Sequence, residues 1–218
     1  LTVGLAVVAP RLLLAAFAAA RESRLARHLP VDLDAPYFRR LLAPFVGARP
    51  RLCVVPYSYA IDARVQAGLG RVAQALLGDA AQVEVLPAVA YGEEARAAEA
   101  LVGVTAAPAL LLGLFNLAAT PEVENHGRFL EGLRRARVTA AADRDPAPAS
   151  VALAVLVDTG PYAQRLGADA GVRLEERCRS WSAFVAARGL RCACVDLDAA
   201  PVGLLERELG PALAGRGP

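Results

Sequence analysis

Beyond residue 50, the chain alternates short, uniformly apolar runs with stretches in which apolar residues recur every three or four positions. A short apolar run bounded by turn residues predicts a buried strand, and the longer spacing predicts a helix with one apolar face. Strands are expected over residues 51–55, 82–86, 109–115, 151–157 and 190–195. Helices are expected over residues 61–76, 93–101, 121–137, 174–185 and 203–209.

Uniformly apolar strands are covered on both faces, which is typical of parallel sheets. We therefore expect an α/β fold with a mostly parallel sheet and helices on both faces, of the Rossmann-like, degenerate nucleotide-binding type. This domain should span residues 51–218. Thr120 is expected to cap the helix over residues 121–137, with Pro121 in its first turn.

The first twenty residues differ from the rest because they are apolar except for Thr2 and Arg11. About 20 apolar residues suffice to cross a bilayer. Arg21, Arg24 and Arg27 follow, and such basic clusters mark the cytoplasmic side of a span. We expect an N-terminal apolar helix, transmembrane or membrane-proximal, with its basic flank over residues 1–29.

A connector over residues 30–50 would then lead into a cytoplasmic domain at the bacterial inner membrane. Two alternatives for residues 1–20 remain open. A signal peptide would carry its basic residues before the apolar run rather than after it, and a buried helix of the domain core needs no membrane. A chain that begins at Leu1 and contains no Met is expected to be a piece of a longer protein.

The amino-acid composition argues against several classes of protein and of site. The chain has 218 residues, 56% of them hydrophobic, so it is too apolar to be disordered. Its net charge is only +2, although all 24 basic residues are Arg, so no basic field indicates nucleic-acid binding. The four cysteines form no Cys-x-x-Cys pair, which argues against a structural zinc site. No metal or cofactor is expected.

Ligands of open α/β sheets bind beyond the carboxyl ends of the strands. The polar residues that follow the predicted strands therefore define a candidate crevice. Its expected members are Tyr57, Ser58, Asn116, Thr120, Glu122, Asn125, His126, Asp158 and Asp196. The same residue types also make ordinary turns. The standard phosphate-binding glycine motifs are missing from the sequence.

Glu122 and His126 form the densest part of this set. Four residues apart on a helix, they would share a face and could act as an acid–base pair or as two metal ligands. Alternatively, Glu122 is an acid favoured by the helix dipole and His126 faces solvent. We favour the second interpretation, in which both residues serve partner contact or loop ordering more than catalysis.

Several strings resemble a family of uncharacterised bacterial proteins that carry a domain of unknown function behind N-terminal membrane spans. They are AVVAPRLLLAAF (6–17), DLDAPYFRRLLAP (32–44), VVPYSY (54–59), VAYGEE (89–94) and FNLAATPEVENHGRF (115–129). Genes of that family commonly neighbour one for a GTPase-type protein. The resemblance implies a membrane-anchored cytoplasmic domain that acts with such a GTPase, and it supplies no reaction.

Three functions are compatible with the sequence. The first is a non-catalytic, membrane-tethered module that binds a protein partner, and we favour it because no complete catalytic constellation is found. The second is a binder or hydrolase of a small anionic or nucleotide ligand at the strand-end crevice. The third is an enzyme of another class centred on Glu122 and His126.

Overall fold

The computed structural model describes residues 49–104, 106–142, 151–167 and 170–214, together with a few positions between residues 11 and 22. Contacts divide the chain into two units, Leu1–Leu33 and Asp34–Pro218. The described positions of the first unit are helical. No described helix has both the length and the apolar character needed to cross a membrane. Most of residues 1–48 lie outside the described part, so the expected membrane segment stays a prediction.

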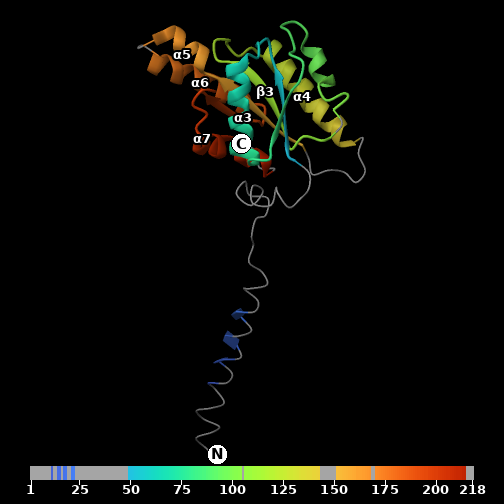
Figure 1. Ribbon diagram of the computed structural model, residues 1–218, viewed down its shortest axis with the longest axis vertical. Coiled ribbons are helices and arrows are strands. Elements are labelled where there is room, and N and C mark those ends of the chain that lie inside the picture. Colours follow the sequence, from blue (N-terminus) through green and yellow to red (C-terminus); the bar gives the residue numbers. More distant parts are fainter. Residues whose placement is uncertain are drawn as a thin grey trace, which may run out of the picture. The chain divides into compact units, whose positions relative to one another are not determined.

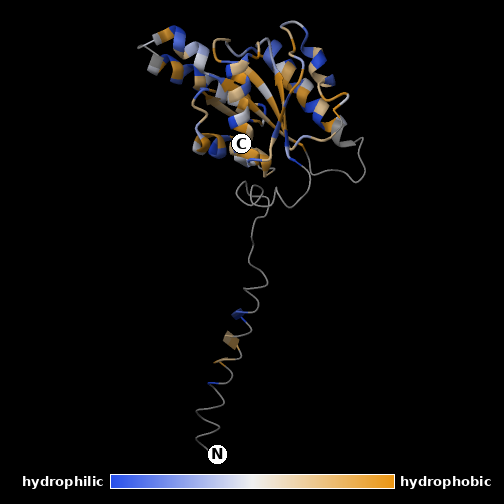
Figure 2. Cartoon of the chain, in the orientation of Figure 1, coloured by the Kyte–Doolittle hydropathy of each residue, from blue (hydrophilic) through white to orange (hydrophobic). Residues whose placement is uncertain are grey.

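The second unit contains a five-stranded, all-parallel sheet with helices on both faces, as the sequence predicts (Figure 1). The strand order is β2-β1-β3-β4-β5. The strands are β1 (Arg51–Pro56), β2 (Gln82–Val85), β3 (Leu110–Asn116), β4 (Ala152–Asp158) and β5 (Arg191–Val195). Each bound lies within one residue of its predicted position. The buried central strands stand out as apolar ribbons in Figure 2.

Alternating side chains of the strands feed two separate cores. On one face, α3 (Ala63–Leu77) and α7 (Val202–Leu213) cover a core that contains Leu112. On the other, η2 (Glu94–Glu99), α4 (Asn125–Ala142) and α6 (Ala170–Ala186) cover a core built around Phe115 and Trp181. Neighbouring strand residues therefore point to different helix layers.

The structure corrects three helix predictions. The helix expected from residue 121 begins at Asn125, so Thr120 is not its N-cap. The helix expected over residues 93–101 is a short 3-10 helix. A seven-residue helix, α5 (Gly160–Leu166), follows β4 where no helix was predicted.

The order of the strands places a switch point between β1 and β3. The chain leaves β1 towards β2 on one side and leaves β3 towards β4 on the other. Crevices in doubly wound sheets form at such a point, outside the carboxyl ends of the two strands. The candidate site is therefore expected beside Tyr57 and Asn116.

Candidate functional site

A cavity of about 250 Å³ lies at this switch point. We call it the crevice. It is lined by Tyr57, Ser58, Tyr91, Phe115, Asn116, Ala119, Thr120, Glu122 and His126. Six of these residues belong to the predicted set. Its volume is slightly below the roughly 300–1,000 Å³ typical of small-molecule sites. A single ring or one side chain therefore suits it better than a nucleotide.

The turn after β1 shapes one wall. Tyr57 continues the strand, because its N–H donates to the Leu114 carbonyl at 2.9 Å. Ser58 then adopts a φ of 45°, in the left-handed region that non-glycine residues rarely occupy. Its N–H donates to the Val89 carbonyl at 2.8 Å, which holds the loop after β2 against the turn. Strain of this kind often concentrates at functional positions.

His126 forms part of the crevice floor, together with Asn116, and is buried, contrary to the expectation of a solvent-facing imidazole. Its ring packs against Tyr57, Phe115 and Trp181, with centroids 5.1–5.5 Å apart. Its Nδ1 accepts a hydrogen bond from the Glu122 N–H at 3.1 Å. The neutral imidazole therefore carries its proton on Nε2. Burial lowers the pKa of His126, although the charges of Glu122 and Glu94 oppose this shift.

Glu122 lies in the turn before α4 rather than on the helix. The expected shared helix face with His126 does not exist, and the two residues meet through the Glu122 backbone instead. The Glu122 carboxylate accepts a hydrogen bond from Asn125 Nδ2 at 2.7 Å. The same Nδ2 donates to the Tyr91 hydroxyl at 2.7 Å. Asn125 thus joins two residues of the crevice rim.

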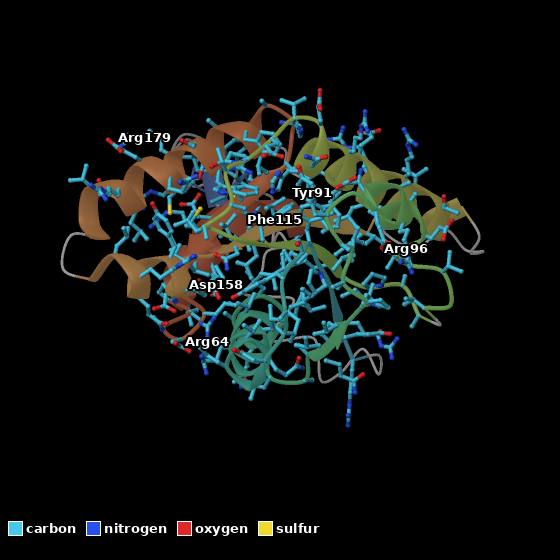
Figure 3. All side chains as sticks on the ribbon, turned by 90° about the horizontal axis from the view of Figure 1, so that it is seen from above. Arg64, Tyr91, Arg96, Phe115, Asp158 and Arg179 are labelled. Carbon is cyan, nitrogen blue, oxygen red and sulfur yellow. The ribbon has the colours of Figure 1, made fainter. Side chains whose placement is uncertain are left out.

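Asp158 and Asp196 do not line the crevice. Asp158 is in register with Asn116, but its side chain points to the α3 face, where its Oδ2 accepts from Arg64 at 2.7 Å and from Tyr59 at 2.6 Å. Figure 3 shows Asp158 and Arg64 on the α3 side, apart from Tyr91 and Phe115. Asp196 accepts from the Asp198 N–H at 2.9 Å and forms a turn.

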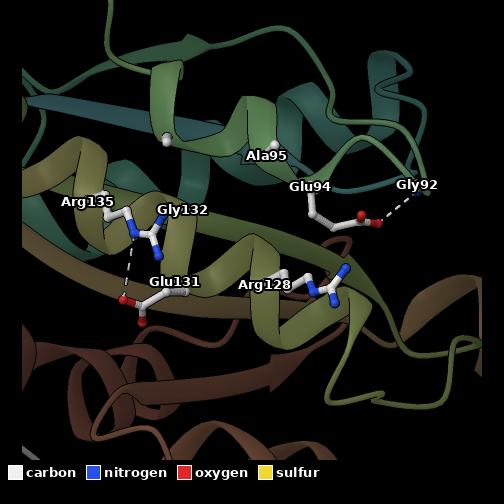
Figure 4. Close-up of a pocket in the computed structure, with 8 residues that line it drawn as sticks. Gly92, Glu94, Ala95, Arg128, Glu131, Gly132 and Arg135 are labelled. Carbon is white, nitrogen blue, oxygen red and sulfur yellow. Dashed lines mark hydrogen bonds and ion pairs between the residues drawn. The ribbon is translucent and has the colours of Figure 1, made fainter.

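A second hollow, of about 400 Å³, lies between η2 and α4 (Figure 4). Its charged lining is mixed: Arg128 and Arg135 face Glu94 and Glu131. Glu94 links this hollow to the crevice, because it accepts from the Tyr57 hydroxyl at 2.5 Å and from the Gly92 N–H at 2.7 Å. Burial raises the pKa of Glu94, but these hydrogen bonds and the Arg128 charge more than offset it, so the pKa is lowered.

The predicted set missed Tyr91, Phe115 and Ala119 among the lining residues. Tyr91 follows an edge strand of only four residues, whose weak apolar signal says little about the loop after it. The alternation of side chains along β4 could have predicted the direction of Asp158. Residues 152, 154 and 156 of β4 all point to the α3 face, and Asp158 is the next residue in that series.

Among the described residues, no group of three or more His, Cys, Asp or Glu side chains could hold a metal ion. No protein-family model matches the chain, and a comparison with curated proteins finds no match either.

Proposed function

We propose that this protein is a membrane-tethered cytoplasmic α/β module without a catalytic role, which binds a protein partner at the carboxyl edge of its sheet. Two large apolar side chains are exposed beside the crevice. Tyr91 is 61% exposed and Val123, next to Glu122 in the chain, is 71% exposed. Exposed apolar residues that are bordered by polar groups favour a protein contact. This observation carries the proposal.

The helix N-termini at this edge favour a protein partner over an anionic ligand. An open helix N-terminus offers free N–H groups to a phosphate. Here Asp62 accepts from the Val65 N–H at the start of α3, at 2.8 Å, and Asp158 accepts from the Gly160 N–H at 3.0 Å. At α4, the Glu122 carbonyl accepts from the Gly127 N–H of the first turn at 3.2 Å. A nucleotide would have to displace these groups or meet their negative charge.

The identity of the partner rests on the family resemblance, which makes a GTPase-type protein encoded by a neighbouring gene the candidate. The membrane tether rests on residues 1–20 and the arginines that follow them.

The test is capture of the neighbouring GTPase-type protein by the full-length chain from detergent-solubilised native membranes. Val123→Asp introduces a charge at the proposed contact, and Val172→Asp is its matched control, because Val172 is 70% exposed on α6. We expect Val123→Asp to lose the GTPase and Val172→Asp to retain it. Equal capture by both variants would contradict the proposed surface.

A thermal shift with GTP and magnesium, or with ATP and magnesium, tests the small-anion alternative. A ligand that binds only the folded state raises the melting temperature by mass action. We expect no shift. A shift that Val123→Asp leaves intact would favour nucleotide binding at the crevice instead.

A further inference from the structure

The polar groups of the crevice floor have a fixed direction of hydrogen bonding. Nδ1 of His126 already accepts from the Glu122 N–H at 3.1 Å, so Nε2 is a donor. Oδ1 of Asn116 accepts from the Ala118 N–H at 2.9 Å, so its Nδ2 is a donor as well. In both side chains, a backbone N–H occupies the acceptor atom. The choice of tautomer and of amide orientation therefore follows from the backbone.

Both donors are left over for a ligand. Neither His126 Nε2 nor Asn116 Nδ2 has a hydrogen-bond partner among the described residues, and neither atom is fully buried. They therefore reach solvent, and the crevice is a cavity that both residues line. Ordered donors on residues that line a cavity with aromatic walls suit a ligand with an oxygen acceptor.

The rim has the opposite character, because its carboxylates accept. Glu122 presents a carboxylate, whose Oε2 accepts from the Tyr91 hydroxyl at 3.5 Å. Glu94 adds a further negative charge behind Tyr57. A carboxylate ligand would find donors on the floor but repulsion from Glu122. An amidinium would pair with Glu122 but leave the floor donors unpaired, which is costly in a desolvated site.

We propose that the crevice binds a neutral carboxamide, whose carbonyl oxygen accepts from His126 Nε2 and Asn116 Nδ2 while its NH₂ group donates at the Glu122 rim. A carboxamide offers an acceptor and donors at once without charge. Its plane can lie against the rings of Tyr57 and Phe115. This inference deepens the proposed function, since an Asn or Gln side chain of the partner is one source of the group. A free small amide is the other.

The probes are benzamide, benzoate and benzamidine, which share one ring and differ in charge. Ligand-detected NMR on the full chain in detergent measures their dissociation constants. We expect benzamide to bind at least about tenfold more tightly than either charged analogue, the size of effect that one unpaired hydrogen-bonding group produces. Tighter binding of benzoate or benzamidine, or no binding by any probe, would overturn the proposal.

Asn116→Asp sharpens the test, because the carboxylate still accepts from the Ala118 N–H while the donor is lost. Its matched control is Gln66→Glu, which makes the same amide-to-acid change at an exposed position of α3. We expect Asn116→Asp to weaken benzamide binding about tenfold and Gln66→Glu to leave it unchanged. An unchanged affinity in Asn116→Asp would place benzamide outside the crevice and overturn the assignment.

A competition experiment identifies the source of the carboxamide. Displacement of the captured GTPase-type protein by benzamide assigns the group to a partner side chain, and benzamide binding without displacement assigns it to a free amide. The two proposals fail separately. Loss of the GTPase from the Val123→Asp variant tests the partner surface without any probe, and the benzamide series needs no partner.

Discussion

At the scale of the residue, Asp158 is the most deeply buried charge of the carboxyl edge. Its carboxylate is fully buried and accepts from Arg64, Tyr59 and the Gly160 N–H. A Cβ at Gly160 would lie 2.9 Å from Asp196 Oδ1 and 3.1 Å from Arg64 Nη1, so these two side chains would have to shift to admit it. This cluster ties α3, β4 and β5 together on the face opposite the crevice.

Two arginine–carboxylate ion pairs with the same N–O distance show how much burial adds to the stability that such a pair contributes. Arg64–Asp158 and Arg96–Glu93 both measure 2.7 Å, but Asp158 is buried while Arg96 and Glu93 are exposed (Figure 3). We expect Arg64→Ala to lower the free energy of unfolding by about 1.5–3 kcal/mol, as for a hydrogen bond to a buried charge. Arg96→Ala should cost about 0–1 kcal/mol. Urea unfolding measures both, and equal losses would contradict the argument.

His126 predicts a pH dependence of stability. Burial lowers its pKa in the folded state below the ordinary value of about 6.5. The unfolded chain then binds the proton more readily, so stability is complete above about pH 6.5 and is lost as the pH falls through the folded pKa. Glu94, whose pKa is also lowered, changes the stability only below about pH 4.5, the ordinary pKa of its carboxyl group.

His126→Phe isolates this effect. Phenylalanine keeps the contact with Tyr57, Phe115 and Trp181 but cannot take up a proton. The variant should lose a constant amount of stability with the Glu122 N–H bond, and its stability should fall less than that of the wild type between pH 7.5 and 5.5. Chemical unfolding at the two pH values measures the difference. Parallel curves for the two proteins would show that His126 is not held neutral.

At the scale of the element, two glycines of α3 separate close packing from helix propensity. A Cβ on Gly68 would lie 2.7 Å from both Cβ and the carbonyl oxygen of Leu197, whereas a Cβ on Gly70 would meet nothing within 4 Å. Gly68 therefore lets α3 approach the turn after β5. Arg71 reinforces the contact by donating to the Leu197 carbonyl at 2.6 Å.

The same substitution in one helix should therefore have opposite effects. Gly70→Ala should raise the free energy of unfolding by about 0.5–1 kcal/mol, because alanine favours the helix. Gly68→Ala should lower it by about 1–3 kcal/mol through overpacking. Thermal or urea unfolding of the two variants checks the signs. A stabilising Gly68→Ala would mean that α3 does not pack closely on the β5–α7 turn.

Helix starts show where local sequence signals mislead. Thr120 and Pro121 satisfy the usual pattern for a helix start, yet α4 begins at Asn125. Thr120 accepts instead from Arg177 on α6, and Glu122 caps the following turn through Gly127, whose N–H donates to the Glu122 carbonyl at 3.2 Å. Arg177 is too far from Thr120 in the sequence for a local pattern to predict the contact. The turn at Glu122 has the same local sequence pattern as the first turn of a helix, so the two could not be told apart.

At the scale of the molecule, the sheet could be predicted because a parallel sheet buries both faces of its central strands. β3 and β4 are almost entirely buried, so their sequences are apolar throughout and their ends are sharp. The position of the site followed from the strand ends. The full set of residues that line it could not be predicted, because Tyr91 comes from the loop after an edge strand and the Asp158 side chain points to the other face.

The proposed membrane tether makes a prediction of its own for the full-length protein. The apolar run over residues 1–20 and the arginines that follow it should hold the protein in the membrane fraction. Sodium carbonate washing should not release it, and detergent should. Recovery of the full-length protein in the soluble fraction without detergent would contradict the tether.

The proposed partner surface is tested by calorimetric titration of the purified GTPase-type neighbour into the full-length chain and its two valine variants. Val123 and Val172 have nearly the same exposure, 71% and 70%, so the variants differ only in where the charge is placed. We expect Val172→Asp to bind like the wild type and Val123→Asp to bind at least about tenfold more weakly, as for a charge placed in an interface. Equal affinity of Val123→Asp and the wild type, or no binding by the wild type, would contradict the proposed partner surface.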